Sequence, residues 1–225
     1  MSTAMADVFT QVVNARRSVR GFLPKPVPTE ILESVFTLAN RAPSNCNTQP
    51  WQTCVVSGET CERLRARLPE AMAQGRLSAD FPYDGKYSGV YRDRQMDAAQ
   101  RLYSAMDIAR EDKAGRNAAF MRNYEFFDAP HAAFIFMPEP FGLREAADCG
   151  MYAQTLMLAL TAHGLASCPQ TALGFHADLL REELDLDKSQ RLLFGLSFGY
   201  EDVDAAANKC RVDRAALTDT TRFYG

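Results

Sequence analysis

The arrangement of apolar runs between residues 131 and 200 most constrains the fold. Residues 131–137 and 192–200 are short and apolar, as buried strands are, whereas residues 143–163 form a long run with little charge after Asp148. That run predicts a central helix buried on nearly all sides, ending at Gly164. Because helices and strands do not alternate as regular βαβ units, the sequence predicts an α+β fold with a mixed or antiparallel sheet flanked by helices.

The N-terminal part predicts two helices, over residues 5–17 and 29–42, followed by a loop, a strand over residues 51–56 and a helix over residues 59–74. No repeat or linker divides the chain, so residues 1–225 are expected to form a single domain. Residues 76–123 differ in character, since an aromatic and glycine-containing loop leads into polar, arginine-rich helix. We interpret this stretch as an insertion over the core that forms a substrate lid.

Composition excludes several functional classes. The net charge is −3 and the pI is about 5.7, so no nucleic-acid partner is expected. No run reaches the roughly 18 apolar residues of a membrane span, and the N-terminus lacks the pattern of a secretion signal. The six cysteines have no disulfide-like or CxxC spacing. We therefore expect a cytoplasmic protein with reduced thiols and no membrane partner.

Three common catalytic or binding motifs are rejected. Residues 195–199 read G-x-S-x-G, but the run is apolar on both sides of Ser197, and all three histidines precede it, against the order that a hydrolase needs. No histidine pair or cysteine pair has metal-ligand spacing, so no metal is expected. A G-x-G-x-x-G fingerprint is absent, which argues against a Rossmann site.

Two cationic segments form a candidate phosphate site. Arg16-Arg17-Ser18-Val19-Arg20 continues past the end of the first predicted helix, and Lys209 and Arg211 stand close together near the C-terminus. Solvated charges at a helix end or in a surface loop would explain either segment alone. Guanidinium groups beside a hydroxyl also suit a phosphate monoester.

The segment between the second helix and the first strand is rich in carboxamides. Asn45, Asn47 and Gln49 alternate there and are followed by Pro50-Trp51. An ordinary polar loop is one explanation. Because each carboxamide both donates and accepts hydrogen bonds, the array also suits the uracil-like edge of an isoalloxazine ring.

In this order and spacing, the motifs RRSxR, PSxxNxQPW, GLASCPQTAL and NKxR resemble the FMN-dependent nitroreductases. The resemblance covers residues from about 10 to 215, apart from the variable stretch 76–123. The loop PYDGKYSGVYRDRQ further resembles the branch that acts on nitroaromatics such as nitrobenzoates. The resemblance implies a nitroreductase-like fold and an intertwined homodimer with FMN at the interface.

The resemblance also implies roles for individual residues. Cofactor-binding positions would be Arg16, Arg17, Ser18, Arg20, Lys209 and Arg211 around the phosphate and pyrimidine edge, Pro43, Ser44, Asn45, Asn47 and Gln49 against the ring and ribityl chain, and Pro169, Gln170, Thr171 and Ala172 over the opposite face. Pro43, Ser44 and Asn45 would come from the other subunit. Many members carry an acidic residue and a glycine where this chain has Thr171-Ala172, a departure that changes the side chains near flavin N5 and keeps the backbone contact.

The implied activity is reduction of nitroaromatics by NADPH or NADH in a ping-pong cycle through flavin N5, to nitroso and then hydroxylamine. No side chain is nominated as catalytic, because the flavin does the chemistry. Expected substrate-binding residues are Tyr83, Tyr87, Tyr91, Phe120 and Tyr124, with about half of the aromatics of the insertion packing onto the core instead. The alternatives are another chemistry on the same fold (dehalogenation, flavin fragmentation, enone reduction, azoline oxidation) and a flavin-binding module without turnover.

Overall fold

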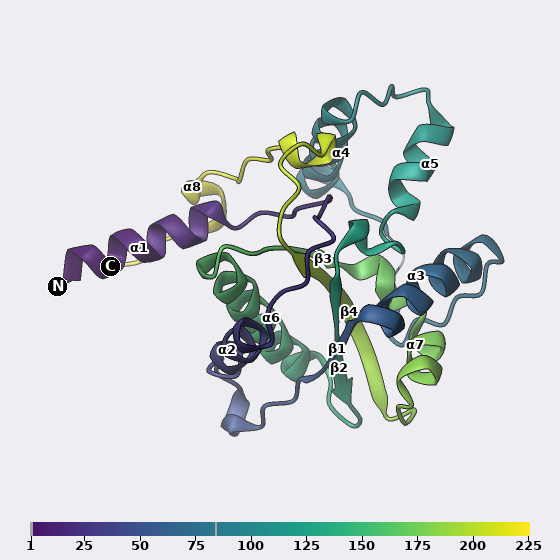
Figure 1. Ribbon diagram of the computed structural model, residues 1–225. Helices are drawn as coiled ribbons and strands as arrows, with labels where there is room; N and C mark the ends of the chain where they lie inside the picture. Colours follow the sequence, from purple (N-terminus) through teal and green to yellow (C-terminus); the bar gives the residue numbers. More distant parts are fainter. Residues whose placement is uncertain (1, 84) are drawn as a thin grey trace.

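A four-stranded antiparallel sheet organises the residues that the structure, a computed structural model, describes, which are 2–83 and 85–225. The strands are β1 (Gln52–Ser57), β2 (His131–Pro138), β3 (Ala166–Gln170) and β4 (Gln190–Gly199), in the order β1-β2-β4-β3. The prediction of an α+β fold with an antiparallel sheet is confirmed. The sheet lies between two layers of helices (Figure 1).

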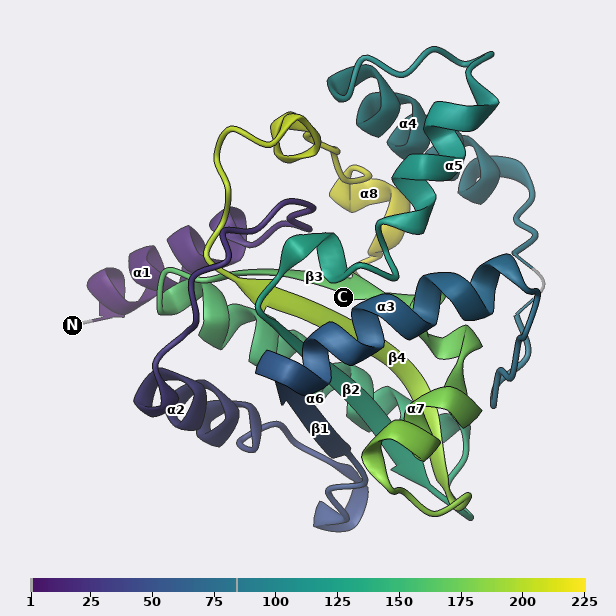
Figure 2. The ribbon, with the colours of Figure 1, turned by 45° about the vertical axis from the view of Figure 1, so that its right-hand side comes forward.

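The central strand β2 shows why three layers form. Its side chains alternate between two buried faces, with Phe134 and Phe136 in one core and Ile135 and Met137 in the other. Helices α3 (Gly58–Ala73) and α7 (Ala177–Leu184) cover the first face, and α2 (Thr29–Ala39) and α6 (Leu143–Ala162) cover the second (Figures 1 and 2). Each large apolar side chain buried in this way contributes roughly 1.5–3 kcal/mol.

The helix predicted over residues 143–163 is α6, but the prediction that it is buried on nearly all sides is wrong within a single chain. Tyr152, Leu156 and Leu160 are buried against the sheet, whereas Met151 and Gln154 face solvent on the opposite side. The helix has no charged residue after Asp148, yet it is covered on one side only. The structure also adds β3 and α7, which the sequence analysis did not assign.

The stretch 76–123 forms two helices, α4 (Gly89–Ala105) and α5 (Lys113–Met121), which lie beyond one end of the sheet (Figures 1 and 2). Helix α4 packs against the short helix η4 (Ala206–Lys209), and Arg101 of α4 forms an ion pair of 3.1 Å with Asp213. The segment is thus attached to the chain's C-terminal part as well as to the core.

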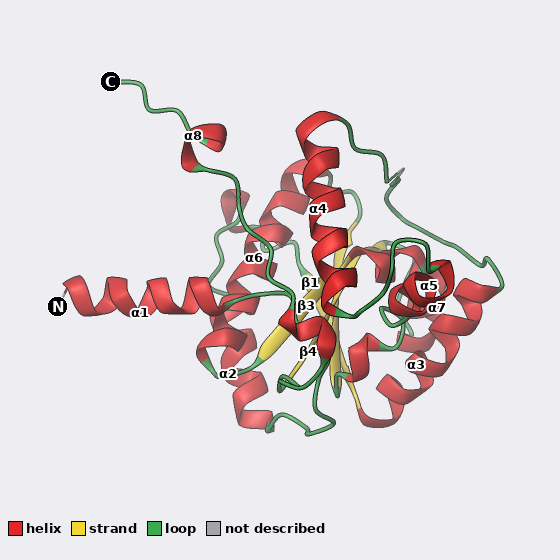
Figure 3. Cartoon of the chain, turned by 90° about the horizontal axis from the view of Figure 1, so that it is seen from above, coloured by secondary structure: helices red, strands yellow, loops and turns green. Residues whose placement is uncertain are grey.

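Helix α1 (Ser2–Ala15) extends away from the body of the molecule, and α8 (Leu217–Thr220) leads into an extended C-terminus (Figure 3). Large apolar side chains on both segments are exposed: Met5, Val8, Phe9, Val13, Leu217, Phe223 and Tyr224. Among the described residues, no helix is both long and apolar enough to cross a lipid bilayer.

Candidate functional site

The two cationic segments found in the sequence meet at one end of the sheet. After α1 the chain runs beside β3, where Ser18 pairs with Ser167 and the Val19 N–H donates to the Ser167 carbonyl at 3.0 Å. Phe22 then pairs with Glu201, which follows β4. The residues after α1 therefore lie next to the segment that carries Lys209 and Arg211. We call Arg16, Ser18, Arg20, Lys209 and Arg211 the cation cluster.

Asn208 joins the two halves of the cation cluster. Its side-chain oxygen accepts from the Arg20 N–H at 2.6 Å, and its amide donates to the carbonyls of Gly21 and Asp202, both at 2.8 Å. Its backbone carbonyl accepts from the Arg211 guanidinium at 2.8 Å. The sequence analysis used Asn208 only as part of the NKxR motif. The side-chain amide of Asn208 is buried and is hydrogen-bonded to Gly21, which lies 187 positions away in the sequence. No local sequence pattern therefore indicates this role.

The charges of the cation cluster are not balanced by carboxylates among the described residues. Across residues 2–83 and 85–225, no carboxylate forms an ion pair with Arg16, Arg20, Lys209 or Arg211. Burial lowers the pKa of the Arg16 guanidinium, and the nearby charge of Arg214 lowers it further. Partly buried like charges are unfavourable unless an anion accompanies them. The cluster thus fits a phosphate group such as that of FMN.

Arg17, although predicted to hold the cofactor, is engaged elsewhere. Its guanidinium forms an ion pair with Glu201 and donates to the Asn208 carbonyl at 3.2 Å. A charge that is already paired contributes less to binding a second anion than an unpaired one. The structure therefore gives Arg17 a role in holding the two segments together.

A cavity of about 210 Å³ opens beside the cation cluster. Arg20 lines one side, while Tyr103 and Phe120 from the 76–123 stretch line another. Its remaining walls come from residues that the sequence analysis did not select: Leu102, Met106, Ala119, Arg122, Asn123, Phe127 and Ala207. The cavity therefore unites a predicted cofactor residue with a predicted substrate residue. The buried Nε of Arg122 has no hydrogen-bond partner among the described residues.

The predicted residues over the flavin face lie where β3 ends and the short helix η3 (Thr171–Phe175) begins. Pro169 is exposed, but the Gln170 side chain turns inward. It donates to the Asn123 carbonyl at 2.8 Å and accepts a short hydrogen bond from Ser197. Ser197 lies within β4, without the strand-to-helix turn of a nucleophile elbow. The Gln170 side chain is thus hydrogen-bonded to Asn123, which lines the cavity of about 210 Å³.

The carboxamide loop, residues 43–50, lies elsewhere. Its polar side chains are largely exposed, and Cys46, Asn47 and Gln49 have positive φ angles of 50°, 55° and 47°. The Gln49 N–H donates to Ser44 Oγ at 2.9 Å, and the Asn45 N–H donates to the buried Asp148 of α6 at 3.0 Å. These contacts shape the loop and leave most of its amide groups facing outward.

The carboxamide loop and the cation cluster lie at opposite ends of the sheet. The loop precedes Gln52 of β1, which pairs with Phe136 of β2, and Phe136 in turn pairs with Leu192 near the start of β4. The cluster adjoins Ser167 of β3, which pairs with Phe198 near the end of β4. At about 3.3 Å per residue, the six residue steps from Leu192 to Phe198 separate these two levels of the sheet by roughly 20 Å along the strands. One chain therefore does not bring the two predicted parts of the site together.

The predicted substrate residues divide into exposed and buried groups. Tyr83, Tyr87 and Tyr91 are about half exposed or more, at 52%, 49% and 64%, and Phe120 lies in the cavity wall. Tyr124 is fully buried, with its ring 5.1 Å from that of His176 and its hydroxyl on the Met72 sulfur. Its assignment to substrate binding is therefore corrected, because Tyr124 belongs to the core.

The chain is similar in sequence to nitroreductases of known activity. At the sequence level, nitroreductase NfnB of Mycolicibacterium smegmatis is 47% identical over 220 residues, which cover 97% of this chain and 94% of that one. A 4-nitrobenzoate reductase of Pseudomonas putida is 35% identical over 225 residues, 98% of this chain and 97% of that one.

The fold matches solved structures of the same kind. The FMN-dependent nitroreductase NfnB from Mycobacterium smegmatis, solved in complex with NADPH, superposes with a TM-score of 0.95 at 46% identity, covering 98% of this chain and all of that one. The model of the Nitroreductase family matches residues 13–200. This chain, with its antiparallel sheet and its uncompensated cation cluster, belongs to the nitroreductase family.

Proposed function

We propose that this chain is an FMN-dependent NAD(P)H:nitroaromatic oxidoreductase. The observation that carries the proposal is the cation cluster, whose charges have no carboxylate partner in residues 2–83 and 85–225 and which lies beside a cavity lined by aromatic side chains. Bound FMN would supply the redox chemistry, which is ping-pong hydride transfer through N5 from NADPH or NADH to a nitro group. The names of the relatives support the same activity.

The chain's own residues would bind and orient the cofactor. Arg16, Lys209 and Arg211 would hold the phosphate by charge-assisted hydrogen bonds, with Ser18 as a further donor. Arg20 lines the cavity and would favour negative charge at the edge of the ring. The backbone N–H groups at the start of η3 would face the ring from the other side. The substitution Thr171-Ala172 leaves such backbone donors in place.

We further propose that the active form is a homodimer in which FMN lies between subunits. Two observations support it. The carboxamide loop and the cation cluster are at opposite ends of one chain, so a second copy has to supply one of them. The outer side of α6 carries Ala147, Gly150 and Met151 in solvent, and α1 exposes Val8 and Phe9. Exposed apolar surface of this extent is typical of a subunit interface.

Residues 76–123 would act as the substrate lid of this single-domain enzyme. Tyr83, Tyr87, Tyr91 and Phe120 would meet the substrate, because aromatic faces stack on a nitroarene and neighbouring guanidinium groups pair with nitro or carboxylate oxygens. Arg94 already lies 5.9 Å from the Tyr91 ring.

We also propose that the protein is located in the cytoplasm, where reduced nicotinamides are available. Cell fractionation followed by immunoblotting tests this location.

The absorption spectrum of the purified protein tests the proposed function. We expect a yellow protein with about one FMN per subunit, as the single cation cluster of each chain provides one phosphate site. Anaerobic NADPH should bleach the flavin band, and 4-nitrobenzoate should restore it. A colourless protein that does not take up FMN contradicts the proposal. Bleaching without reoxidation by any nitroarene would instead favour another chemistry on the same fold.

A further inference from the structure

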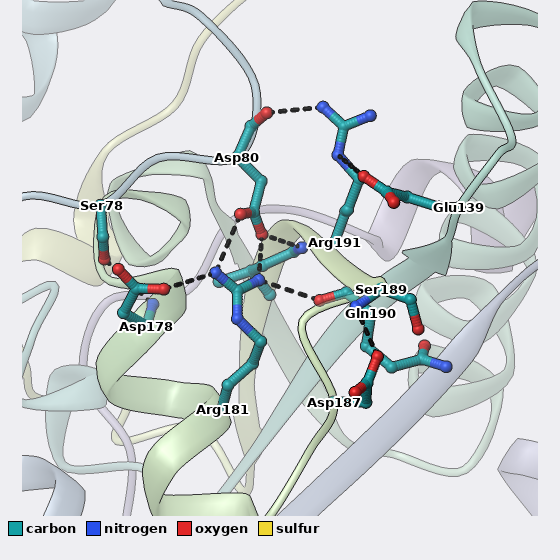
Figure 4. A network of polar contacts seen from close by, with 10 residues as sticks. Ser78, Asp80, Glu139, Asp178, Arg181, Asp187, Ser189, Gln190 and Arg191 are labelled. Atoms are coloured by element: carbon teal, nitrogen blue, oxygen red, sulfur yellow. Dashed lines mark hydrogen bonds and ion pairs between the residues drawn. The ribbon is translucent and has the colours of Figure 1, made fainter.

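A buried ion pair fastens the beginning of the 76–123 stretch to the core (Figure 4). The Arg181 guanidinium on α7 donates to both carboxylate oxygens of Asp80, at 2.6 and 3.0 Å. The two side chains are only 9% and 14% exposed. A fork of two parallel hydrogen bonds fixes orientation as well as distance, which a point charge does not. Asp80 is thereby held in one position.

The neighbouring strand strengthens this attachment. The Leu192 N–H of β4 donates to the Asp80 carboxylate at 2.6 Å, and the Arg191 side chain donates to the Asp80 carbonyl at 2.7 Å. The same Arg191 guanidinium lies 4.2 Å from the centre of the Phe81 ring. Both the side chain and the backbone of Asp80 are therefore held, by α7 and β4 together (Figure 4).

Directly after this attachment the chain forms one wall of a second cavity, of about 170 Å³. Tyr83 lies on that wall, with its ring 5.8 Å from the ring of Phe175. Thr171, expected beside the flavin, and Leu193 line the same cavity. The cavity thus joins an expected substrate residue to an expected cofactor residue, and Asp80 sits three positions before Tyr83.

We propose that Asp80 and Arg181 form a positioning pair for substrate selection, which holds Tyr83 at the wall of the cavity shared with Thr171. The inference rests on the proposed function and names residues that set which nitroarenes fit. Neither side chain is a catalytic residue, because both act through the placement of Tyr83. A buried ion pair costs desolvation and adds little net stability, and in some proteins such groups specify a geometry instead, as we propose for Asp80 and Arg181.

The test replaces Asp80→Asn, which keeps the shape of the side chain and removes its charge. The matched control is Asp178→Asn, since Asp178 also pairs with Arg181, at 2.8 Å, but is 70% exposed and lies outside the cavity wall. Specificity constants are measured for a small and a large nitroarene, together with FMN content and the rate of flavin reduction by NADPH. We expect the ratio of the two specificity constants to change at least about threefold in D80N, mainly through KM. D178N should keep the parental ratio.

A double-mutant cycle separates positioning from general loosening of the fold. If Asp80 acts through Tyr83, the D80N substitution should change the ratio little in a Tyr83→Ala background. An equal effect in both backgrounds, an equal effect of D178N, or an unchanged ratio in D80N would each overturn the inference. Should D80N fail to fold, the double variant Asp80→Asn, Arg181→Gln removes both buried charges, leaves only the exposed Asp178 without its partner, and carries the same expectation.

The outcome is distinguishable from failure of the proposed function. If the parent protein binds no FMN or reduces no nitroarene, the proposed function fails and the inference with it. If the parent is active and D80N has parental selectivity with normal flavin content, only the inference fails. Normal flavin reduction by NADPH in D80N, together with altered selectivity, supports it.

Discussion

The cation cluster and the carboxamide loop are both expected to contact FMN, but they differ in how far contacts within one chain fix their geometry. The cluster is tied together by the buried Asn208 and by pairing of Ser18 with β3. The carboxamide loop is held at its start by Asp148, and its outer groups face solvent. One part of the site is therefore preorganised by a single chain, while the other exposes its polar side chains to solvent, where a second copy could contact them.

This difference means that the two regions should respond differently to mutation. A change at the cation cluster alters either the charge offered to the phosphate or the stability of the chain. A change at the subunit interface should remove the contribution of the carboxamide loop without disturbing the fold of the subunit. The tests below are ordered from the largest expected effect to the smallest.

Met151→Arg should have the largest effect. Met151 is 40% exposed on the outer side of α6, and a charge buried there without a partner would cost several kcal/mol of dimerisation free energy. We expect a folded monomer with FMN affinity reduced by more than about a hundredfold. Analytical ultracentrifugation and flavin titration measure both, with Met151→Leu as the control. A monomer that keeps FMN would show that the cation cluster suffices alone.

Arg20→Ala and Arg211→Ala should each weaken FMN binding by roughly ten- to a hundredfold, since a charge-assisted hydrogen bond is worth about 1.5–3 kcal/mol. The control is the double variant Arg17→Ala, Glu201→Ala, which removes an ion pair without changing the net charge. Its FMN affinity should fall less. Fluorescence titration gives the three dissociation constants. Equal losses of FMN affinity in all three variants would mean that Arg17 contributes to FMN binding as much as Arg20 and Arg211 do, despite its ion pair with Glu201.

Asn208→Ala should lower the stability of the subunit. Its side chain is 3% exposed and makes three hydrogen bonds, to Arg20, Gly21 and Asp202, so truncation leaves buried groups unsatisfied at a cost of about 1–3 kcal/mol. The melting temperature should fall by several degrees in the FMN-free protein. Asn47→Ala, in the exposed carboxamide loop, should leave that temperature unchanged. Equal melting temperatures of the two variants would contradict the hypothesis that Asn208 preorganises the cation cluster.

The smallest effect concerns the sheet between the two regions. His131 accepts from the Val27 N–H at 2.9 Å through Nε2, and burial lowers its pKa and that of His176. The native state therefore binds protons less readily than the unfolded state, so stability should fall as the pH drops below about 6.5. Urea unfolding at a series of pH values measures this. His131→Asn should reduce that dependence, and an unchanged profile would contradict the assignment.

The predicted elements were accurate where the pattern was long and regular, as for α6 and β2. Strand β3 was missed because Ala166–Gln170 is short, contains Pro169 and shows no alternation of apolar and polar residues. It is a strand because it pairs with β4. Helix α7 was not assigned either, although its eight residues are amphipathic and bury Ala177 and Leu180. Strand β3 itself has no local signature, since it depends on pairing with a strand distant in sequence.

For the site, the sequence by itself determined which chemical groups are present: the guanidinium groups, the carboxamides and the aromatic side chains, in an order that indicates the family. Only the tertiary structure decided which of them are available. It paired Arg17 with Glu201, buried Tyr124, and made Asn208 and Asp80 the residues that hold others in place. The physical reason is that availability depends on burial and on partners up to 191 positions away, which no local pattern encodes.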